Sequence, residues 1–511
     1  MHIKPPMRSR VLWLLLSVAT PLAAQEASPY VPLQHWAMPY VEHLIATGVL
    51  TDPTPLTRPL RRADLVLALQ AADTFDVSDA SYAMVRRLLR EFKPRLHGPQ
   101  YRVAVDAGVS AATYAVRDPL EQGRGRPATP YPYGASRVFE NVGADLELLF
   151  GPGIAVTHPY EDRRLRFDQD WYDTRRNGLR TAEAYLDGQW RYAEVFFGAL
   201  DKNWGPSGVQ GLLLSDNPYN LDHFAFALGP PRVQLQAIVT ELDPGTDSTG
   251  ATVNRYMMEH RLYVHPHGRW TFSIWEGTEW PGVGRQAEPW FLNALNLGLI
   301  VRGYQGIGNA KSFVGSDVER HGAVTLFGQF LLGDIHINRG TPEELKPVSY
   351  GLTAGAKGGF GGNAWTLFYT QVANFTYREF DTLRTPLFHS LGVGRNFDDY
   401  DQLTAKLGIL TRPGVLFEPE ITVLRQGEGD PRLPYPPVAA WPATPVIFQG
   451  VVERTVRLAL GGRWEGPRLG LVANAGVHFV HNASHITGAS ATHFVGSVAL
   501  KFRLHSEGAL P

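Results

Sequence analysis

Residues 183–200 read Glu-Ala-Tyr-Leu-Asp-Gly-Gln-Trp-Arg-Tyr-Ala-Glu-Val-Phe-Phe-Gly-Ala-Leu, and the pattern around them decides the fold. Two runs of alternating character, residues 183–186 and 190–200, flank the dipeptide Asp187-Gly188. Asp-Gly between such runs is a strong hairpin signal, because a two-residue primed turn needs positive φ. The stretch therefore predicts two antiparallel strands joined by a tight turn.

A long connection follows this hairpin, and the same order of lengths then repeats. Residues 201–222 form the long connection, residues 223–228 the next run, and Gly229-Pro230-Pro231 the next tight break. Transmembrane β-barrels have short turns at one end and long loops at the other. A soluble sandwich shows the same strand alternation but has no reason to sort its connections by length, so the order favours a barrel.

The rest of the chain continues this alternation of connections. Counting strands from Tyr101 gives about 18, an even number typical of bacterial barrels. The parity of the count puts the N-terminal part and the C-terminus at the short-turn, periplasmic side. Tight breaks are expected at residues 151–153, 187–188, 229–231, 265–268, 358–363, 412–414 and 465–467, with a longer segment, 303–322, at one tight position. Long connections are expected at residues 116–139, 158–179, 201–222, 243–254, 278–291, 334–348, 374–401, 426–445 and 479–491.

Apolar residues alternate with polar ones along the candidate strands. This period of two is typical of strands with one apolar face. The clearest apolar series are Val103, Val105, Ala107 and Val109; Ala144, Leu146, Leu148 and Phe150; and Phe494, Val498, Leu500, Phe502 and Leu504. The last apolar residue of this series is Leu504, so residues 505–511 are expected to follow the last strand as a tail.

Composition excludes several classes of protein. The 511 residues are 44% hydrophobic and only 19% charged, which argues against disorder. A formal net charge of -1 gives no reason to expect a nucleic acid as a partner. Without cysteine, neither a disulfide framework nor a thiolate metal site can form. No cofactor-binding or metal-ligand spacing occurs, so no cofactor and no metal are expected.

The first 24 residues have the pattern of a signal peptide. Lys4, Arg8 and Arg10 precede an apolar stretch at residues 11–19, and small residues at 22–24 fit cleavage before Gln25. The apolar stretch is too short for a spanning helix. An exported chain can still cross a membrane as a closed barrel. We therefore expect a signal peptide over residues 1–24, a helical periplasmic module over 25–98 and an outer-membrane barrel over 99–511.

Residues 30–95 show a helical period in three places. The sequence segments around Trp36, Tyr40 and Leu44, followed by Thr57-Arg58, resemble an S-layer-homology-like helical module. That resemblance implies either contact with cell-wall polymer such as peptidoglycan or a helical cap on the barrel. A plain three-helix packing domain is an equally good interpretation. The expected apolar faces are Trp36, Tyr40 and Leu44; Leu60, Ala63, Leu67 and Ala71; and Tyr82, Val85, Leu89 and Phe92.

A second resemblance covers nearly the whole of residues 101–504. The element Lys202-Asn-Trp-Gly-Pro206 with Gly211-Leu-Leu-Leu-Ser-Asp-Asn217 resembles a Trp-Gly-Pro-Gly … Leu-Ser-Asn-Asn element of Wzi-type capsule assembly proteins. Ser207 stands where that family shows a second glycine. The resemblance implies an 18-stranded outer-membrane barrel that holds capsular polysaccharide. Further matches are His260-Arg261-Leu262, Trp270 with Ser273 and Glu276, residues 326–334, Asp398-Asp399 and residues 425–430.

One expected outer loop, residues 161–180, combines arginines with aromatic rings. Guanidinium forks bind carboxylates and rings offer flat apolar faces, which an acidic polysaccharide requires. The alternative is an exposed loop whose aspartates neutralise the arginines, with guanidinium groups against outer-membrane lipid phosphates. Trp204 is expected either on the same outer surface or as part of a plug in the lumen. The candidate polysaccharide-binding residues are Arg163, Arg164, Arg166, Trp171, Tyr172, Arg175, Arg176 and Trp204.

The sequence does not predict an enzyme. His481, Ser484 and His485 lie close together, but a polar outer loop explains them as well as a Ser–His pair does. The expected function is binding and anchoring of surface polysaccharide in capsule assembly. The alternative is a substrate-specific porin, which needs an open polar lumen at a similar strand count.

Overall fold

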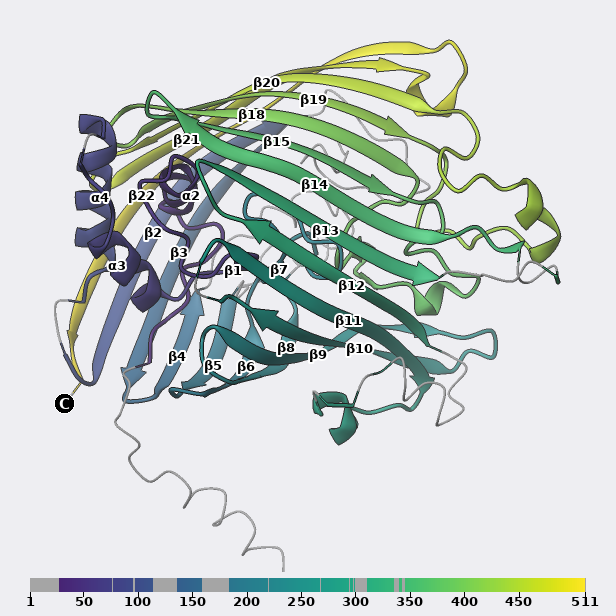
Figure 1. Cartoon of the computed structure of the whole chain (residues 1–511), viewed down its shortest axis with the longest axis horizontal. Coiled ribbons are helices and arrows are strands. Elements are labelled where there is room, and N and C mark those ends of the chain that lie inside the picture. Colours follow the sequence, from purple (N-terminus) through teal and green to yellow (C-terminus); the bar gives the residue numbers. More distant parts are fainter. Residues whose placement is uncertain are drawn as a thin grey trace, which may run out of the picture.

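The computed structural model describes residues 27–75, 77–94, 97–113, 136–158, 183–218, 220–266, 268–293, 295–296, 298, 310–334, 340–341 and 345–510. Within these ranges, eighteen antiparallel strands close into one barrel (Figure 1). The expected all-β barrel with a small helical part is therefore confirmed. The proposed export signal lies in residues 1–26, outside the described part of the chain, and stays a prediction.

The strands of the wall follow one another around the barrel in chain order. The last strand pairs with the first, so that Gln100 lies opposite Ala509 and the sheet has no edge. The wall consists of β2 (Gln100–Thr113), β3 (Ser136–Phe150), β4 (Gly153–His158), β5 (Glu183–Gln189), β6 (Ala193–Ala199), β8 (Asp222–Leu228), β9 (Val233–Thr246), β10 (Thr252–Val264), β11 (Trp270–Val283), β12 (Lys311–Arg320), β13 (Val324–Asp334), β14 (Ser349–Phe360), β15 (Asn363–Val372), β18 (Tyr400–Arg412), β19 (Val415–Gln426), β20 (Glu453–Glu465), β21 (Leu469–His481) and β22 (Ser490–Ala509).

Large apolar side chains cover the outside of this wall. Because successive side chains point to opposite faces, each strand places every second residue outward. In a soluble protein so many exposed apolar groups would be unfavourable, whereas a bilayer solvates them. The barrel is therefore a transmembrane barrel. Exposed examples are Val105 and Val109 on β2, Leu186 on β5, Phe197 on β6, Ile274 on β11, Leu326 and Phe330 on β13, Leu403 on β18, Ile421 on β19, Leu458 on β20, Phe479 on β21, and Phe494, Val498, Leu500, Phe502 and Leu504 on β22.

Short and long connections lie at opposite ends of the barrel, as the sequence predicts. Two to five residues join β3 to β4, β5 to β6, β8 to β9, β10 to β11, β12 to β13, β14 to β15, β18 to β19 and β20 to β21 at what we call the short-turn end. The intervening connections form the long-loop end, and the long loops carry the short helices η2 (Pro289–Leu292), η4 (Thr382–Arg384), η5 (Val438–Ala443) and η6 (Ala483–His485). The chain's C-terminal strand ends at the short-turn end (Figure 1).

The expected turn at Asp187-Gly188 is wrong by a few residues. Strand β5 continues through both residues to Gln189, and the turn falls at residues 190–192. The Asp187 side chain points inward and accepts a hydrogen bond from Gln189 Nε2 at 2.7 Å. Gly188 lies opposite Gly153 in the ladder with β4. A partner strand on each side outweighs the local turn preference of the dipeptide.

Three other boundaries differ from the expectation. The segment 303–322 contains a wall strand, β12, so the turn at that position is the short stretch 321–323. The connection between β9 and β10 is only residues 247–251, because β9 extends to Thr246. Strand β22 continues to Ala509, because β2 supplies a partner for every residue up to that point. Residues 505–509 are therefore part of the wall and not a tail.

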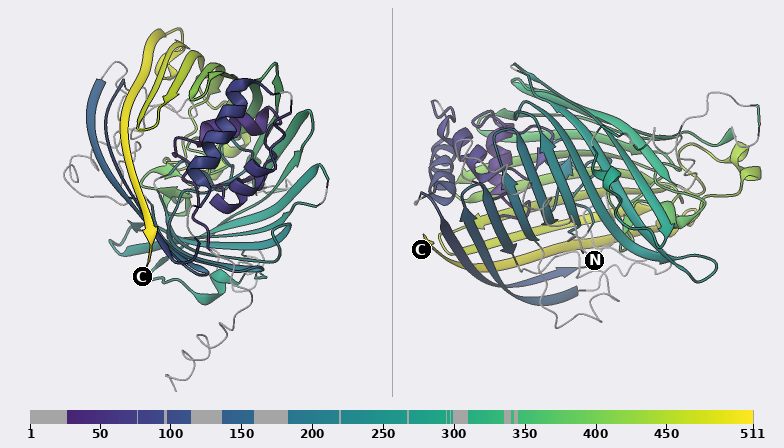
Figure 2. Two further views of the ribbon diagram at one scale, coloured as in Figure 1. Left: turned by 90° about the vertical axis from the view of Figure 1, so that its left-hand side faces the viewer. Right: turned by 90° about the horizontal axis from the view of Figure 1, so that it is seen from below.

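The helical module occupies the mouth of the barrel at the short-turn end (Figures 1 and 2). It comprises α2 (Met38–Ala46), α3 (Arg62–Gln70) and α4 (Asp79–Phe92), with the two-residue strand β1 (Thr57–Arg58) between α2 and α3. Its buried apolar side chains form one cluster that also includes Leu410 and Leu416 of the wall. None of the described helices is long and apolar enough to cross a membrane.

The apolar faces of α2 and α4 largely match the expectation, and that of α3 does not. Tyr40 and Leu44 of α2 are buried, as are Val85 and Phe92 of α4, while Tyr82 is exposed. Helix α3 buries its side chains at positions 65, 66 and 69 and leaves position 67 in solvent. Its first residue, Arg62, contacts the wall and donates to both carboxylate oxygens of Glu147 at 2.7 Å. This anchor fixes the rotation of the helix.

The helical module is docked on the short turns of the wall. Tyr40 donates its hydroxyl hydrogen to the carbonyl of Gly414 at 2.9 Å, and Arg87 donates to the carbonyl of Gly466 at 2.7 Å. Gly414 has φ of 82° and a Cβ there would lie 2.7 Å from Arg87 Nη1, so the turn and the docking both require glycine. The contacts fix the module to two different turns of the barrel.

Candidate functional site

The long connection between β6 and β8 folds into the barrel lumen instead of extending from the rim. We call residues 200–221 the first plug loop. Its strand β7 (Asn203–Trp204) pairs antiparallel with β1 of the helical module, with Trp204 opposite Thr57. Asn203 closes the loop, because its side chain accepts from Gly211 N at 2.7 Å and donates to Val209 O at 3.0 Å. The first plug loop is thus a folded element.

The connection between β15 and β18 also turns inward and interlocks with the first loop. We call residues 373–399 the second plug loop; it contains the short hairpin of β16 (Leu387–Phe388) and β17 (Leu391–Gly392). Ser215 Oγ donates to Gly394 O at 2.5 Å, and Asn217 Nδ2 donates to Gly392 O at 2.8 Å. In return, the Tyr377 hydroxyl donates to Leu212 O at 2.5 Å.

The two plug loops share one apolar core with the wall. Leu212, Leu213 and Leu214 of the first loop are between 0% and 4% exposed, although they belong to a loop. They pack with inward side chains of wall strands from β4 to β19. Burying one such side chain contributes about 1.5–3 kcal/mol. On this side of the barrel the lumen holds a protein core.

A buried polar group fastens the first plug loop to the wall. Gln329 of β13 accepts from Leu212 N at 2.7 Å and donates to Trp204 O at 2.9 Å. The same amide donates to Asp317 Oδ1 at 2.6 Å, and Ser273 donates to Asp317 Oδ2 at 2.5 Å. Three of the motifs that carry the Wzi-type resemblance thus meet here, through Trp204 and Leu212, Ser273, and Gln329, and they hold the plug.

Arg261 adds a link from this polar group to the helical module. Its guanidinium lies 3.4 Å from Asp317 Oδ2 and donates to Leu56 O at 2.9 Å and to Thr57 Oγ1 at 2.8 Å. The same guanidinium lies 5.2 Å from the centroid of the Trp204 ring, within cation–π range. One side chain therefore joins the wall, the first plug loop and the N-terminal module.

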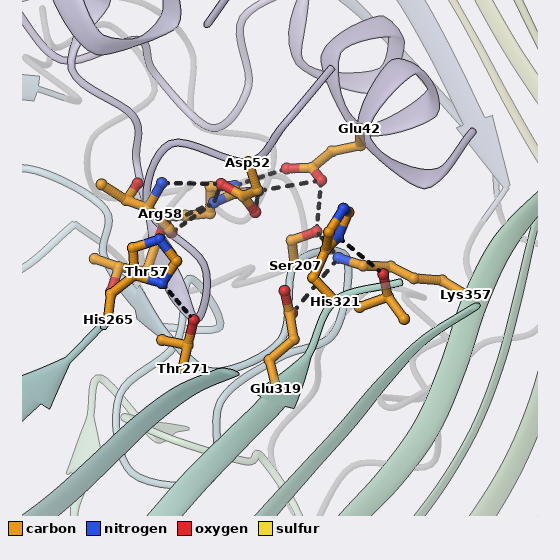
Figure 3. Close-up of polar contacts among 12 residues, drawn as sticks. Glu42, Asp52, Thr57, Arg58, Ser207, His265, Thr271, Glu319, His321 and Lys357 are labelled. Atoms are coloured by element: carbon orange, nitrogen blue, oxygen red, sulfur yellow. Dashed lines mark hydrogen bonds and ion pairs between the residues drawn. The ribbon is translucent and has the colours of Figure 1, made fainter. Parts of the chain in front are cut away.

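A second polar group joins the helical module to the plug at the short-turn end (Figure 3). Arg58 pairs with Asp52 and with Glu42, each at 2.7 Å. Burial alone would raise the pKa of Asp52, but the adjacent Arg58 guanidinium outweighs burial and holds the pKa below its usual value. Asp52 is therefore a charged partner of the buried Arg58 guanidinium, and Glu42 pairs with the same guanidinium.

Ser207 extends this group into the barrel. Its hydroxyl donates to Glu42 Oε2 at 2.5 Å and accepts from Lys357 Nζ at 2.9 Å (Figure 3). Lys357 of β14 also lies 3.8 Å from Glu319 of β12. The sequence places Ser207 where the Wzi-type family shows glycine, and here the hydroxyl bridges a helix and the wall. A glycine could not make that bridge.

At the long-loop end, two adjacent aspartates organise the second plug loop. Asp398 accepts from the backbone of Tyr377 and of Arg378, and Asp399 accepts from the backbone of Gly429 and Gln449 at 3.0 and 2.9 Å. Burial raises the pKa of Asp398 to about 8 and that of Asp399 to about 6. The pair connects three segments, which explains why the two motifs at 398–399 and 425–430 occur together.

An aromatic cluster supports the same end of the barrel. Phe375 stacks on Tyr435 with ring centroids 4.8 Å apart, and Trp441 meets Tyr435 edge-on at 5.8 Å. All three rings are buried. Lys346 lies 4.8 Å from the centroid of the Tyr435 ring, and Lys311 pairs with Glu379 at 2.8 Å. The cluster gives the long-loop end a rigid base.

The candidate polysaccharide-binding residues divide into two groups. Arg163, Arg164, Arg166, Trp171, Tyr172, Arg175 and Arg176 all lie outside the described residues, so their role stays a prediction. Trp204 is described and is 3% exposed within the first plug loop. Its position matches the plug alternative, and a contact with sugar stays a prediction.

The candidate catalytic and metal-binding groups can also be placed. His481 Nδ1 lies 3.4 Å from Ser490 Oγ, and His485 Nδ1 lies 2.7 Å from Val451 O. Ser484 instead uses its backbone N–H, which donates to Glu453 at 2.7 Å. Across the described ranges, no group of three or more histidines or carboxylates is arranged to hold a metal ion.

Sequence reasoning missed Gln329 and Asp317, which hold the plug. Their partners lie on other segments of the chain; for example, Gln329 and Trp204 are 125 positions apart. The only available signal was that Gln329 lies in the family-like stretch 326–334.

Solved structures that are similar to this chain include one carbohydrate-binding barrel and two more distant proteins. Wzi of Escherichia coli, described as an outer membrane protein involved in group 1 capsule assembly and as a carbohydrate-binding β-barrel, has a TM-score of 0.62. The match covers 95% of this chain and 100% of that chain at 13% identity, which shows a shared fold. Two Pseudomonas aeruginosa proteins, OpdQ (TM-score 0.43, 8% identity, 80% and 98% covered) and OprD (TM-score 0.41, 9% identity, 85% and 99% covered), are too distant to support an inference.

No protein-family model matches the chain, and no curated protein matches it in sequence. The S-layer-homology-like resemblance of the helical module therefore has no support beyond the residues quoted for it, and it stays a prediction.

Proposed function

We propose that this chain is an outer-membrane protein that binds and anchors surface polysaccharide, such as a capsule, at its long-loop end. The observation that carries the proposal is the occupied lumen. Two plug loops and the helical module share cores and buried polar groups with the wall. A barrel built in this way suits a binding role better than transport.

The orientation in the membrane follows from the connection lengths. In outer-membrane barrels the short turns face the periplasm and the long loops face outward. This orientation puts the helical module in the periplasm and the Asp398–Asp399 region at the cell surface. It also agrees with export through the expected signal peptide over residues 1–24.

The type of ligand rests on two supports. One is the shared fold with Wzi, a carbohydrate-binding barrel. The other is the sequence of residues 161–180, where arginines stand beside aromatic residues. Guanidinium groups pair with carboxylates and rings stack on sugar faces, so an acidic polysaccharide suits the loop. No catalytic step is part of this function.

The alternative function, a substrate-specific porin, needs a continuous aqueous path through the barrel. Arg457 of β20 and His478 of β21 face inward and are polar, which is the feature that favours this alternative. On the opposite side of the lumen, however, Leu212 and its neighbours form a core with the wall. This core supports anchoring over transport.

The test uses intact encapsulated cells that lack the native protein. Cells that carry the wild-type chain should keep polysaccharide on the surface, and cells without it should release polysaccharide to the medium. Replacing Arg163, Arg164, Arg175 and Arg176 by Ser should shift polysaccharide from the cells to the medium, because the carboxylate partners are lost. A control variant replaces three arginines at the opposite end, Arg191 and Arg269 in short turns and Arg412 at the end of β18.

Equal retention by the wild type and the deletion strain would refute anchoring. If the deletion strain loses polysaccharide but the loop variant retains as much as the wild type, the anchoring function stands and the arginine-rich loop has no part in it.

A further inference from the structure

A cavity of ≈ 580 Å³ lies between the helical module and the inner wall of β2, β3 and β22. The described residues that line it include seven arginine or lysine side chains and four aspartate or glutamate side chains. This volume lies within the range of ligand-binding sites, about 300–1,000 Å³. The cavity opens at the short-turn end, away from the surface used in the proposed function.

Internal ion pairs occupy two of the four acidic residues. Glu147 accepts from Arg62 with both oxygens, and Glu91 pairs with Arg102 at 2.7 Å. The cation excess therefore remains after these pairs are formed. Arg87 is held against the Trp36 ring, with the guanidinium 4.6 Å from its centroid. A flat aromatic ring beside cations is a combination that suits charged sugars.

A second, shallower groove of ≈ 510 Å³ adjoins the cavity on the outer side of α4. Its lining contains the cations Arg86, Arg90 and Lys93 and no acidic residue. Arg90 lines both hollows, so the positive surface runs without interruption from the cavity across α4.

These outer cations are exposed. In the described part of the chain, no carboxylate forms an ion pair with Arg86, Arg90 or Lys93, and the same holds for Arg468 at the rim of the cavity. Elsewhere on the helical module, Arg58 and Arg62 are paired. Unpaired cations gathered along one continuous hollow are available to bind an anion.

We propose that the short-turn end binds a linear anionic polysaccharide, which enters the cavity beside Trp36 and continues across α4. A single small anion would need only one pocket, whereas the cations here extend over two adjoining hollows. The repeating charge is a uronate carboxylate or a phosphodiester, and both pair with guanidinium groups. This site is separate from the long-loop surface and needs only the fold described above.

The experiment uses the purified full-length chain in detergent micelles and calorimetric titration. The probes are a ten-residue oligogalacturonate, a glycerol-phosphate oligomer, neutral malto-oligosaccharide and inorganic phosphate. The test variant is Arg86→Gln/Arg90→Gln/Lys93→Gln, and a second variant is Arg468→Gln. The matched control is Arg191→Gln/Arg269→Gln/Arg412→Gln, three exposed arginines at the same end, of which Arg191 and Arg269 lie in short turns and Arg412 ends β18.

The wild-type chain should bind one or both anionic oligomers, more weakly at high salt, and should not bind the neutral sugar. The triple variant should bind roughly tenfold more weakly because three charge-assisted contacts are lost, and the control should match the wild type. Binding of only one oligomer identifies which charged group is recognised.

Equal affinity for neutral and anionic oligomers would overturn the proposal. Equal affinity of the triple variant and the control would also overturn it, as would phosphate binding as tightly as an oligomer. Because retention of surface polysaccharide by whole cells is measured separately, failure here leaves the proposed function untouched.

Discussion

Replacing Gln329 by Ala should release the first plug loop from the wall. The side chain makes three hydrogen bonds, to Leu212 N, Trp204 O and Asp317, and is 4% exposed. Asp317 keeps Ser273 as a donor, so the main cost comes from the two backbone groups left without partners. At about 1–3 kcal/mol for each such buried group, the loop should lose about 2–6 kcal/mol of stability.

The assay is hydrogen exchange of the backbone amides in residues 203–217, measured on protein in detergent micelles. Local opening that becomes easier by this amount makes exchange at least roughly 30-fold faster, and up to roughly 25,000-fold faster at the upper end of the range. Gln371→Ala is the control, because Gln371 lies in the wall and accepts from the hydroxyl of Tyr350, which also belongs to the wall, at 3.1 Å. That variant should leave exchange of the plug amides unchanged.

Unchanged exchange in the Gln329 variant would refute the reasoning. It would mean that the apolar core alone holds the plug and that the buried polar group contributes nothing to it.

Three further predictions concern the two ends of the barrel. Burial raises the pKa of Asp398 to about 8 and that of Asp399 to about 6, so their contribution to stability is complete at acid pH and is lost as pH rises through these values. The protection of amides at the long-loop end, expressed relative to the exchange rate of an unstructured chain at each pH, should therefore fall from pH 5.5 to 8.5, and replacing both residues by Asn should remove this fall. Burial lowers the pKa of His43 to about 4, so its contribution to stability is present above about pH 6.5 and is lost as the pH falls towards 4. Acid should therefore loosen the helical module, which Trp fluorescence can measure. A His43→Leu variant that loosens equally in acid would contradict the role of His43. Leu65→Ala should lower the stability of the helical module by about 2–5 kcal/mol, because Leu65 is buried. Leu67→Ala should lower it by under about 0.5 kcal/mol, because Leu67 is 63% exposed. Equal protease sensitivity of the two variants would contradict the assignment of the buried face of α3.

The wall of the barrel could be predicted because its signals are local. Outward positions such as Phe494, Leu500 and Leu504 are apolar at every second residue, and a bilayer requires this of each strand independently. Connection lengths then gave the strand number and the end at which the helical module lies. The turn at Asp187-Gly188 was misplaced because neighbouring strands, which a local pattern does not contain, extend β5 past it.

The contents of the lumen could not be predicted in the same way. Inward polar residues such as Gln329 have the same pattern whether they face water or a plug. Only the fold reveals that Gln329 lies against Trp204 and that Ser207 reaches Lys357. The prediction of the buried face of α3 was wrong for a related reason, because the helix is oriented by a contact with the wall, that of Arg62 with Glu147. The arginine-rich loop at 161–180 stays a prediction from sequence.

The occupied lumen is the central claim, and single-channel recording of the purified wild-type chain in planar bilayers tests it most directly. With the plug loops and the helical module in place, the inserted protein should show no steady large openings. Stable openings of the size of a porin channel would contradict the claim and with it the preference for anchoring over transport.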